Sequence, residues 1–480
     1  MATGEKKVMK RREFLKTGGA LAALSACPTV PAWAAPAKID KVLRPSAIEL
    51  ALGGAETRTR FWGYNDAVPG PIIRARKGDA VRLVLDNALP VDTAIHWHGL
   101  RVPHAMDGVP HISQLPTKPG EKFTYEFKLP DSGTFWYHPH QNSHEQVGRG
   151  LYGAFIVEEE KPIVVDRDEV WVLSDVKLDA NAQPVEDFGR VTDLANEGRL
   201  GNLVLINGQP AKPERSFVVR SGERLRLRLI NAASARIFDL AFEGHGAQVI
   251  AHDGQAVVPY SPASLMLGPG MRVDLIIDCV YKPGSRFAVI DKHRRALGTL
   301  GALAYSDEKP VRSKPLKAPI QLAANVLPEP NLSKATDHFI VFQGGMRGVP
   351  VIGLVDGKPS KIHEIIEKYG LAWTMNFSAQ HEHAQMQEPL LHARKGEHIA
   401  LHLVNETDYY HPMHLHGHFF KVIAINGRKV ARPDWRDTMM MAPRESLDVA
   451  FVADALGEWM FHCHILDHSA GGMMGTIAVE

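Results

Sequence analysis

The chain has 480 residues, 45% of them hydrophobic and 23% charged, with 41 glycines and 32 prolines. This composition is typical of a globular protein rich in turns, and it excludes a disordered chain or a coiled coil. The 55 basic residues nearly balance the 54 acidic ones, so we expect no nucleic-acid partner. The unusual ratio is 24 histidines to three cysteines, and histidine is the commonest metal ligand.

Residues 1–34 predict an export signal. Arg11 and Arg12 precede an apolar run, and Ala32-Trp33-Ala34 forms a small-residue cleavage site. The run has about ten residues, whereas a membrane-spanning helix needs roughly 20, so we expect no transmembrane span. The pattern predicts a twin-arginine signal peptide and a periplasmic or extracytoplasmic protein that is exported folded. Because Leu24-Ser25-Ala26-Cys27 also fits a lipoprotein motif, a lipid anchor at Cys27 is an alternative to cleavage.

One strand pattern occurs three times. Residues 78–87, 222–231 and 396–405 each begin with glycine and end nine residues later with asparagine. Apolar residues alternate within each copy, which predicts a half-buried strand entered from a tight turn. Three copies predict an all-β chain of three consecutive β-sandwich domains. The expected domains are residues 36–160, 161–305 and 336–480, with residues 306–335 as a linker rich in proline and lysine.

Four His-x-His pairs lie at equivalent places in the first and third repeats. Two pairs begin nine residues after the asparagine of their repeat, and two begin five residues after a glycine, while the middle repeat has none. Residues two apart on a strand point to the same face, so each pair presents two imidazoles to one place. Eight imidazoles are more than the three or four ligands that one zinc ion binds. The pairs therefore predict a metal cluster between the first and third domains. The eight residues are His96, His98, His138, His140, His414, His416, His462 and His464.

A second metal site is expected around Cys463. This residue separates two histidines of one pair, so strand alternation directs its thiol away from the cluster and into the third domain. One cysteine, two histidines and a weakly bound methionine form the blue-copper electron-transfer site. The expected partners of Cys463 are His411, His468 and Met473.

On these motifs, the sequence closely resembles the multicopper oxidases of the bacterial laccase-like, three-domain type over nearly all of residues 45–480. The matching segments are His96-Trp97-His98-Gly99, His138-Pro139-His140, residues 411–417 and residues 462–473. The resemblance implies cupredoxin-like Greek-key domains and four coppers. It assigns the type 1 copper to His411, Cys463, His468 and Met473, the type 2 copper to His96 and His414, and the type 3 pair to His98, His138, His140, His416, His462 and His464.

The resemblance also implies the reaction, which couples four one-electron oxidations of a small reducing substrate to the reduction of O2 to two waters. Asp107 and Asp467 match positions where related oxidases carry acids that serve the cluster. Because one chain supplies both sides of the cluster, we expect a monomer.

The reducing substrate is expected to be a phenol or an aromatic amine. The alternative is Cu(I), oxidised in periplasmic copper tolerance. The copper-efflux oxidases carry a methionine-rich segment in the third domain, and this chain lacks such a segment there. A scaffold protein with the same fold and no copper is a third class. Such a protein would have lost ligands, and none is missing here.

Two further features are interpreted without a functional role. His381-Glu382-His383, with Met386 nearby, is expected to be a solvated loop because no repeat supports a metal site there. Cys279 is expected to be a buried, unreactive thiol.

Overall fold

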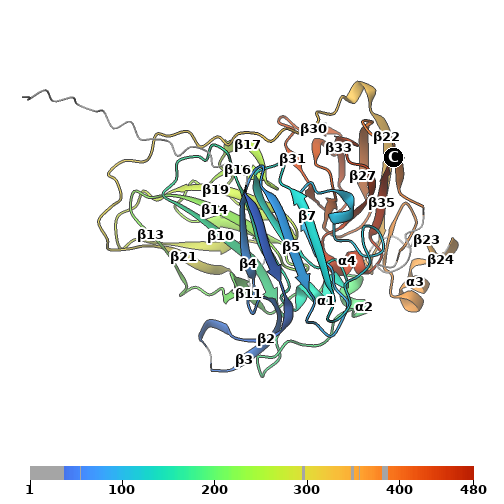
Figure 1. Cartoon of the computed structure of the whole chain (residues 1–480), viewed down its shortest axis with the longest axis horizontal. Coiled ribbons are helices and arrows are strands. Elements are labelled where there is room, and N and C mark those ends of the chain that lie inside the picture. Colours follow the sequence, from blue (N-terminus) through green and yellow to red (C-terminus); the bar gives the residue numbers. More distant parts are fainter. Residues whose placement is uncertain (1–36, 55, 294–297, 348–350, 356, 381–387) are drawn as a thin grey trace, which may run out of the picture. The chain divides into compact units, whose positions relative to one another are not determined.

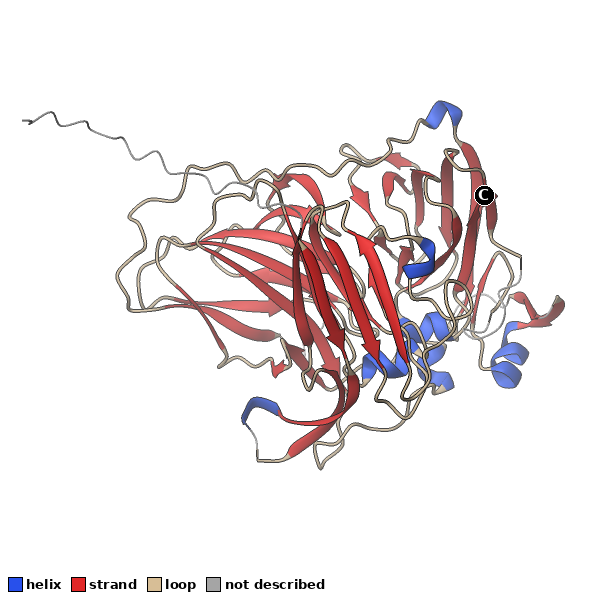
Figure 2. Ribbon diagram, viewed as in Figure 1, coloured by secondary structure: helices blue, strands red, loops and turns tan. Residues whose placement is uncertain are grey.

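The computed structural model describes residues 37–480 except 55, 294–297, 348–350, 356 and 381–387. Strands predominate over a few short helices (Figure 2), and residues Pro36–Glu480 form one compact unit. No helix among the described residues has the length and apolar character of a membrane span. The expected signal peptide, Cys27 and the His381-Glu382-His383 segment lie outside the described residues.

The first part of the chain forms two sheets and a separate strand pair. Their apolar faces contribute to one buried cluster that includes Leu83, Trp97, Tyr125 and Phe155. In neighbour order, the sheets are β1 (Lys38–Leu43), β5 (Ala80–Asp86) and β7 (Lys122–Lys128), and β4 (Gly70–Arg76), β9 (Gly153–Glu158), β8 (Gly133–His138) and β6 (His96–His98). The pair is β2 (Pro45–Ala51) with β3 (Arg58–Tyr64), and the helix α1 (Ser143–Gly148) follows β8.

The middle part forms a seven-stranded and a five-stranded sheet, and β10, β14 and β19 of the larger one lie side by side in Figure 1. Leu227, Leu229, Phe238 and Val273 belong to the buried cluster that both sheets share. The first sheet has the order β12 (Gln209–Pro210), β11 (Leu203–Ile206), β10 (Arg167–Val176), β14 (Arg224–Asn231), β19 (Arg272–Asp278), β16 (Gln248–His252) and β17 (Gln255–Tyr260). The second has the order β13 (Ser216–Val219), β21 (Thr299–Tyr305), β20 (Arg286–Asp291), β15 (Phe238–Phe242) and β18 (Leu265–Leu267), and α2 (Val191–Leu194) connects β10 to β11.

The last part repeats the two-sheet arrangement. One sheet contains β25 (Trp373–Met375), β22 (Thr336–Gly344), β27 (His398–Asn405), β33 (Ser446–Val452), β29 (Phe420–Ile425) and β30 (Arg428–Lys429), with β31 (Trp435–Arg436) also paired to β29. The other contains β26 (Leu391–Ala393), β35 (Met474–Val479), β34 (Gly457–Cys463), β28 (His411–Leu415) and β32 (Thr438–Met441). The pair β23 (Ile352–Val355) and β24 (Lys358–Lys361) precedes α3 (Ile362–Tyr369), and α4 (Leu466–Ala470) follows β34. The predicted all-β fold of successive sandwiches is confirmed.

The three sequence repeats are β5, β14 and β27, and their asparagines explain why the pattern recurs. Each strand has one parallel and one antiparallel neighbour. The side-chain amides of Asn87, Asn231 and Asn405 each donate to two nearby backbone carbonyls. In the first and third repeats, these bonds fix the loop that leads to a histidine strand.

The predicted half-burial is wrong for the middle repeat. Every residue of β14 is buried, including Arg224, Arg226 and Arg228, which are at most 4% exposed. Acidic and hydroxyl groups cover this face: Arg226 pairs with Glu159 and Asp274, and Arg228 donates to the Thr134 hydroxyl. The polar face of this strand therefore lies in an interior contact and not in solvent.

Candidate metal centre

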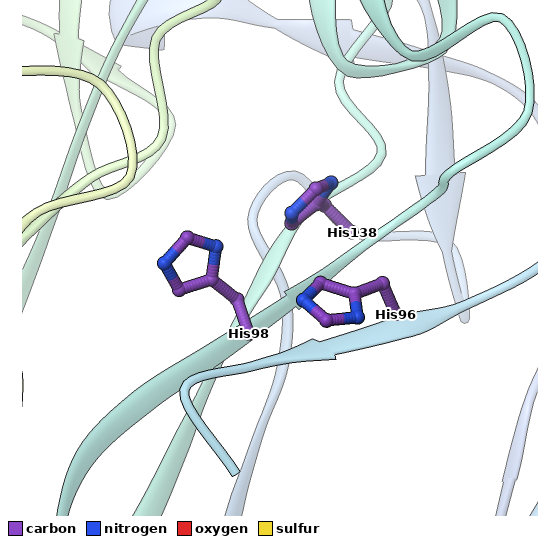
Figure 3. A group of neighbouring side chains, drawn as sticks. All are labelled: His96, His98 and His138. Atoms are coloured by element: carbon purple, nitrogen blue, oxygen red, sulfur yellow. The ribbon is translucent and has the colours of Figure 1, made fainter. Parts of the chain in front are cut away.

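The strands β6, β8, β28 and β34 bring the eight predicted histidines together. Cross-strand pairing places His96 opposite His138 and His414 opposite His462. The side chains of His96, His98 and His138 lie close together, within a possible metal-binding distance of one another (Figure 3). All eight are buried, at no more than 4% exposure.

Histidines far apart in the sequence meet face to face. The rings of His98 and His414 stack at 3.7 Å between centroids, and those of His96 and His416 stack at 3.8 Å. Three sets have ligand atoms within 4.8 Å of one another: His96 with His98 and His138, His96 with His414 and His416, and His140 with His416 and His462. His464 joins them with its ring 4.9 Å from that of His98 and 5.2 Å from that of His138.

Backbone carbonyls fix which ring nitrogen of several histidines carries the proton. The Nδ1 atoms of His96, His138 and His414 donate to the carbonyls of Asp107, Pro139 and Asp437 at 2.9, 3.0 and 2.9 Å. Their Nε2 atoms are buried and have no hydrogen-bond partner among the described residues. A buried nitrogen without a partner is costly in a folded protein. These lone pairs therefore fit metal ligands.

Burial also favours the neutral form of several of these rings. It lowers the pKa of His98, His138, His140, His416 and His464 well below the usual value, and neighbouring histidines lower it further. The pKa of His462 falls to about 3 for the same reason. Neutral imidazole is the form that binds metals, so the centre is ready for a cation at neutral pH.

The second predicted site is also assembled. Cys463 Sγ lies 3.6 Å from both His411 Nδ1 and His468 Nδ1, and these two nitrogens lie 3.1 Å apart. The opposite ring nitrogens are held by Thr407 Oγ1, at 2.7 Å from His411 Nε2, and by the Asn196 carbonyl, which accepts from His468 Nε2 at 2.5 Å.

A backbone hydrogen bond holds Met473 beside Cys463. The amide of Cys463 donates to the Met473 carbonyl at 3.1 Å, and Met473 is fully buried in the core of this region. Burial raises the pKa of the Cys463 thiol above its usual value. A metal that binds there must therefore displace the proton, and a soft thiolate favours copper.

The two predicted acids occupy different surroundings. Asp107 is buried against the cluster, where its Oδ2 accepts from His416 Nδ1 at 2.8 Å and its Oδ1 lies 3.3 Å from His96 Nδ1. Asp467 is buried too, but its Oδ2 accepts from the Arg199 amide at 2.9 Å. Within the described chain, no hydrogen bond joins Asp467 to a cluster histidine.

Sequence reasoning missed the polar residues that hold the histidines. Besides Thr407 and Asn196, these are Asp437 and Thr438, whose side chains contact His98 and His414. Arg272 forms a buried ion pair with Asp437 and lowers the pKa of that carboxyl below its usual range. Nothing in the local sequence marks these residues, because every one of these contacts except the one from Thr407 joins distant parts of the chain.

A cavity of about 370 Å³ lies beside His468. Apolar and aromatic side chains line it together with charged ones, including Leu200, Ile237, Tyr409, Tyr410, Glu197 and Arg347. This volume suits a small organic molecule. Through His468, the cavity adjoins the site that contains Cys463.

Three sequence profiles described as multicopper oxidase match residues 50–162, 170–306 and 356–480. A multi-copper oxidase from Pseudomonas thermotolerans has a crystal structure that is 32% identical, with a TM-score of 0.81, and the match covers 93% of this chain and 100% of that one. Multicopper oxidase MmcO of Mycobacterium tuberculosis is 29% identical over 98% of this chain and 96% of its own length. A copper resistance protein A homolog of Pseudomonas syringae is 27% identical, over 98% and 99% of the two chains.

The chain therefore belongs to the multicopper oxidase family. It has the cupredoxin-like domains of that family, and it is a copper-dependent oxidoreductase that passes electrons from a reducing substrate to oxygen. The family and the fold that the histidine motifs predicted are confirmed.

Proposed function

We propose that the chain binds four coppers in two centres and acts as a laccase-like oxidase of organic donors. The observation that carries this proposal is the convergence of eight buried histidines, of which His96, His98, His138, His414 and His464 each have a ring nitrogen without a hydrogen-bond partner among the described residues. The type 1 copper is assigned to His411, Cys463, His468 and Met473. The type 2 copper is assigned to His96 and His414, and the type 3 pair to His98, His138, His140, His416, His462 and His464.

Bound copper would supply one-electron exchange at the cysteine site and four-electron reduction of O2 to water at the cluster. The chain itself supplies the connection between the two centres. Cys463 belongs to the first centre, while its bonded neighbours His462 and His464 belong to the second. Electrons that enter at the thiolate therefore have a short covalent path to the cluster.

Asp107 and Asp467 are proposed as the acids that hold protons for oxygen reduction. The Asp107 carboxylate, beside His96 and His416, is placed to orient these rings and to hold a proton within the centre. Asp467 lies three residues after His464 with one buried oxygen, Oδ1, free of described partners. Unlike Asp107, it has no hydrogen bond to a cluster histidine among the described residues.

Organic donors are proposed to dock in the cavity beside His468. The aromatic rings of Tyr409 and Tyr410 and the apolar side chains of Leu200 and Ile237 can contact a phenol or an aromatic amine. Cu(I) is the alternative donor. The thioether of Met346 lies 3.2 Å from Asn196 Nδ2, and Met346 is exposed. One soft ligand for Cu(I) is therefore present close to the residue whose carbonyl holds His468.

The experiment compares turnover of a phenol with turnover of Cu(I) by the copper-loaded protein. We expect the phenol to be oxidised, with oxygen consumed, when no copper beyond the four equivalents is present. If phenols are turned over only with excess copper while Cu(I) is oxidised efficiently, the chain is a metal oxidase. Replacing Tyr410 by Ala should raise KM for the phenol more than it changes KM for Cu(I).

The organisation of the whole chain is also proposed. We assign residues 1–34 to a twin-arginine signal, 36–160, 161–305 and 336–480 to the three domains, and 306–335 to the linker. The spans of the matching family profiles support this division. A periplasmic or extracytoplasmic monomer, with lipidation of Cys27 as an alternative to cleavage, completes the proposal.

A further inference from the structure

The middle part of the chain supplies none of the eight histidines, yet one of its arginines lies directly behind them. Arg272, on β19, is fully buried and forms a two-pronged ion pair with Asp437, with Nη1 2.6 Å from Oδ1 and Nη2 2.5 Å from Oδ2. Its Nε donates to the Thr134 carbonyl at 3.2 Å, and its Nη2 donates to the Asp253 carbonyl at 3.1 Å. Contacts from all three parts of the chain thus fix this guanidinium.

Thr438 connects this ion pair to the cluster. Its hydroxyl oxygen lies 2.7 Å from Asp437 Oδ1, 3.0 Å from His98 Nε2 and 3.1 Å from His414 Nδ1. A carboxylate can only accept hydrogen bonds, so Thr438 donates its single hydrogen to Asp437. Both histidine nitrogens must then act as donors to the Thr438 oxygen.

This requirement fixes the tautomers of two rings from different domains. His98 carries its proton on Nε2 and keeps a lone pair on Nδ1, and His414 carries its proton on Nδ1 and keeps a lone pair on Nε2. His98 Nδ1 and His414 Nε2 are both buried without a partner among the described residues. They are the atoms left for a metal.

We propose that Arg272 is a positioning residue for the copper cluster, acting through Asp437 and Thr438 to hold His98 and His414 in their metal-binding tautomers. The inference rests on the proposed ligand set. It gives the ligand-free middle domain a direct part in building the centre. Partners that orient metal-ligating histidines commonly change metal affinity 10–100-fold when they are removed.

The residue after His98 gives independent support. Gly99 has a φ of +85°, and a Cβ atom there would lie 2.2 Å from Arg272 Nη2 and 2.7 Å from Asp437 Oδ2. No side chain fits this place while the ion pair is present. The glycine of the His-Trp-His-Gly motif therefore makes room for the arginine from the middle domain.

The first test is Thr438→Val, which removes the hydroxyl and keeps the shape. We expect the cluster coppers to be lost to a competing chelator about 10–100-fold more readily. The electron paramagnetic resonance signal of the type 2 copper, which is assigned to His96 and His414, should also change. The blue absorption of the Cys463 site should remain. Thr438→Ser, which restores the hydroxyl, should restore copper retention.

Thr93→Val is the matched control. It also removes a buried hydroxyl, one that bonds Gln146 Oε1 at 2.7 Å, but no histidine. It should leave copper retention at the wild-type level even if stability falls. Equal copper loss in Thr93→Val and Thr438→Val would overturn the inference, because a general loss of packing would then explain both.

The second test is Arg272→Lys, which keeps the charge and loses the planar fork. It should weaken the same coppers as Thr438→Val, and the double variant should be little worse than the more affected single variant because both act on one chain of contacts. Wild-type retention in Thr438→Val, or fully additive losses in the double variant, would contradict the proposal. A wild-type protein that fails to bind four coppers would instead contradict the proposed function.

Discussion

Cys463 is the residue on which the two proposed centres depend together. Its sulfur lies among His411 and His468, and its peptide neighbours are cluster histidines. Cys463→Ser replaces the soft thiolate with a hard hydroxyl, so the blue colour and the oxidation of donors should be lost. Copper analysis should still find the three cluster coppers.

Cys279→Ser is the control, since Cys279 is a buried thiol of the middle core whose pKa is raised to about 12. It should keep both colour and activity. Retention of the blue colour in Cys463→Ser would show that the thiolate of another residue binds the metal.

Met473 should adjust the cysteine site without being needed to build it, because the axial bond in such sites is long and weak. Met473→Leu conserves volume, so the blue colour should remain. The reduction potential should rise because a donor that favours Cu(II) is gone. The measurement is a redox titration of the blue copper in Met473→Leu and in the control Met375→Leu, which replaces another buried methionine of the same core. An unchanged or lower potential in Met473→Leu alone would indicate another axial ligand.

Asp107→Asn should slow reoxidation of the reduced protein by oxygen about 100-fold or more, while reduction of the cysteine site by substrate stays nearly unchanged. Protons are consumed only where oxygen is reduced, which separates the two half-reactions in stopped-flow measurements. Asp467→Asn is expected to act in the same direction. Asp131→Asn removes a buried carboxylate that pairs with Arg101 and has no described hydrogen bond to a cluster histidine, so it should leave both rates unaltered. Slower bleaching with normal reoxidation would rule out the proton role.

At the residue scale, the sequence predicted which histidines lie together better than it predicted the polar residues that hold them. Histidine pairs two residues apart and a cysteine between two of them are local patterns, so strand alternation is enough to group them. Arg272 and Asp437 are 165 positions apart, Thr438 and His98 are 340 apart, and even Thr438 and His414 are 24 apart. Spacing within one segment carries no information about such contacts.

At the scale of elements, strand alternation predicts one buried face but not what covers the other. Arg82 in β5 and Arg226 in β14 both stand four residues after the glycine of their repeat. Arg82 is 36% exposed in its side chain and pairs with Asp40, whereas the Arg226 side chain is 2% exposed between Glu159 and Asp274. The same sequence position is thus a surface site in one domain and an interior ion pair in another.

This pair of arginines supports a stability prediction. Arg226→Met should lower the free energy of unfolding by about 3–5 kcal/mol, because it leaves two buried carboxylates without their partner. Arg82→Met should change it by about 0.5 kcal/mol or less, as expected for an exposed pair. Urea denaturation of both copper-loaded variants provides the measurement. Similar effects of the two substitutions would mean that the interior pairing does not stabilise the protein.

At the scale of the whole molecule, residues from all three parts of the chain build the proposed metal centres. The first and third parts supply the cluster histidines. The middle part supplies the Asn196 carbonyl behind His468 and the Arg272 guanidinium behind His98 and His414. The sequence repeat predicted the successive sandwiches, but only the packed structure shows that the middle part contacts both proposed centres.

The central claim is that one chain builds a cysteine-containing copper site and a separate three-copper cluster. Titration of the copper-free protein with copper, followed by metal analysis and visible absorption, tests it most directly. We expect saturation at four coppers per chain, with an intense blue band that accounts for one of them and depends on Cys463. Saturation below four, or a colourless protein at full loading, would contradict the account.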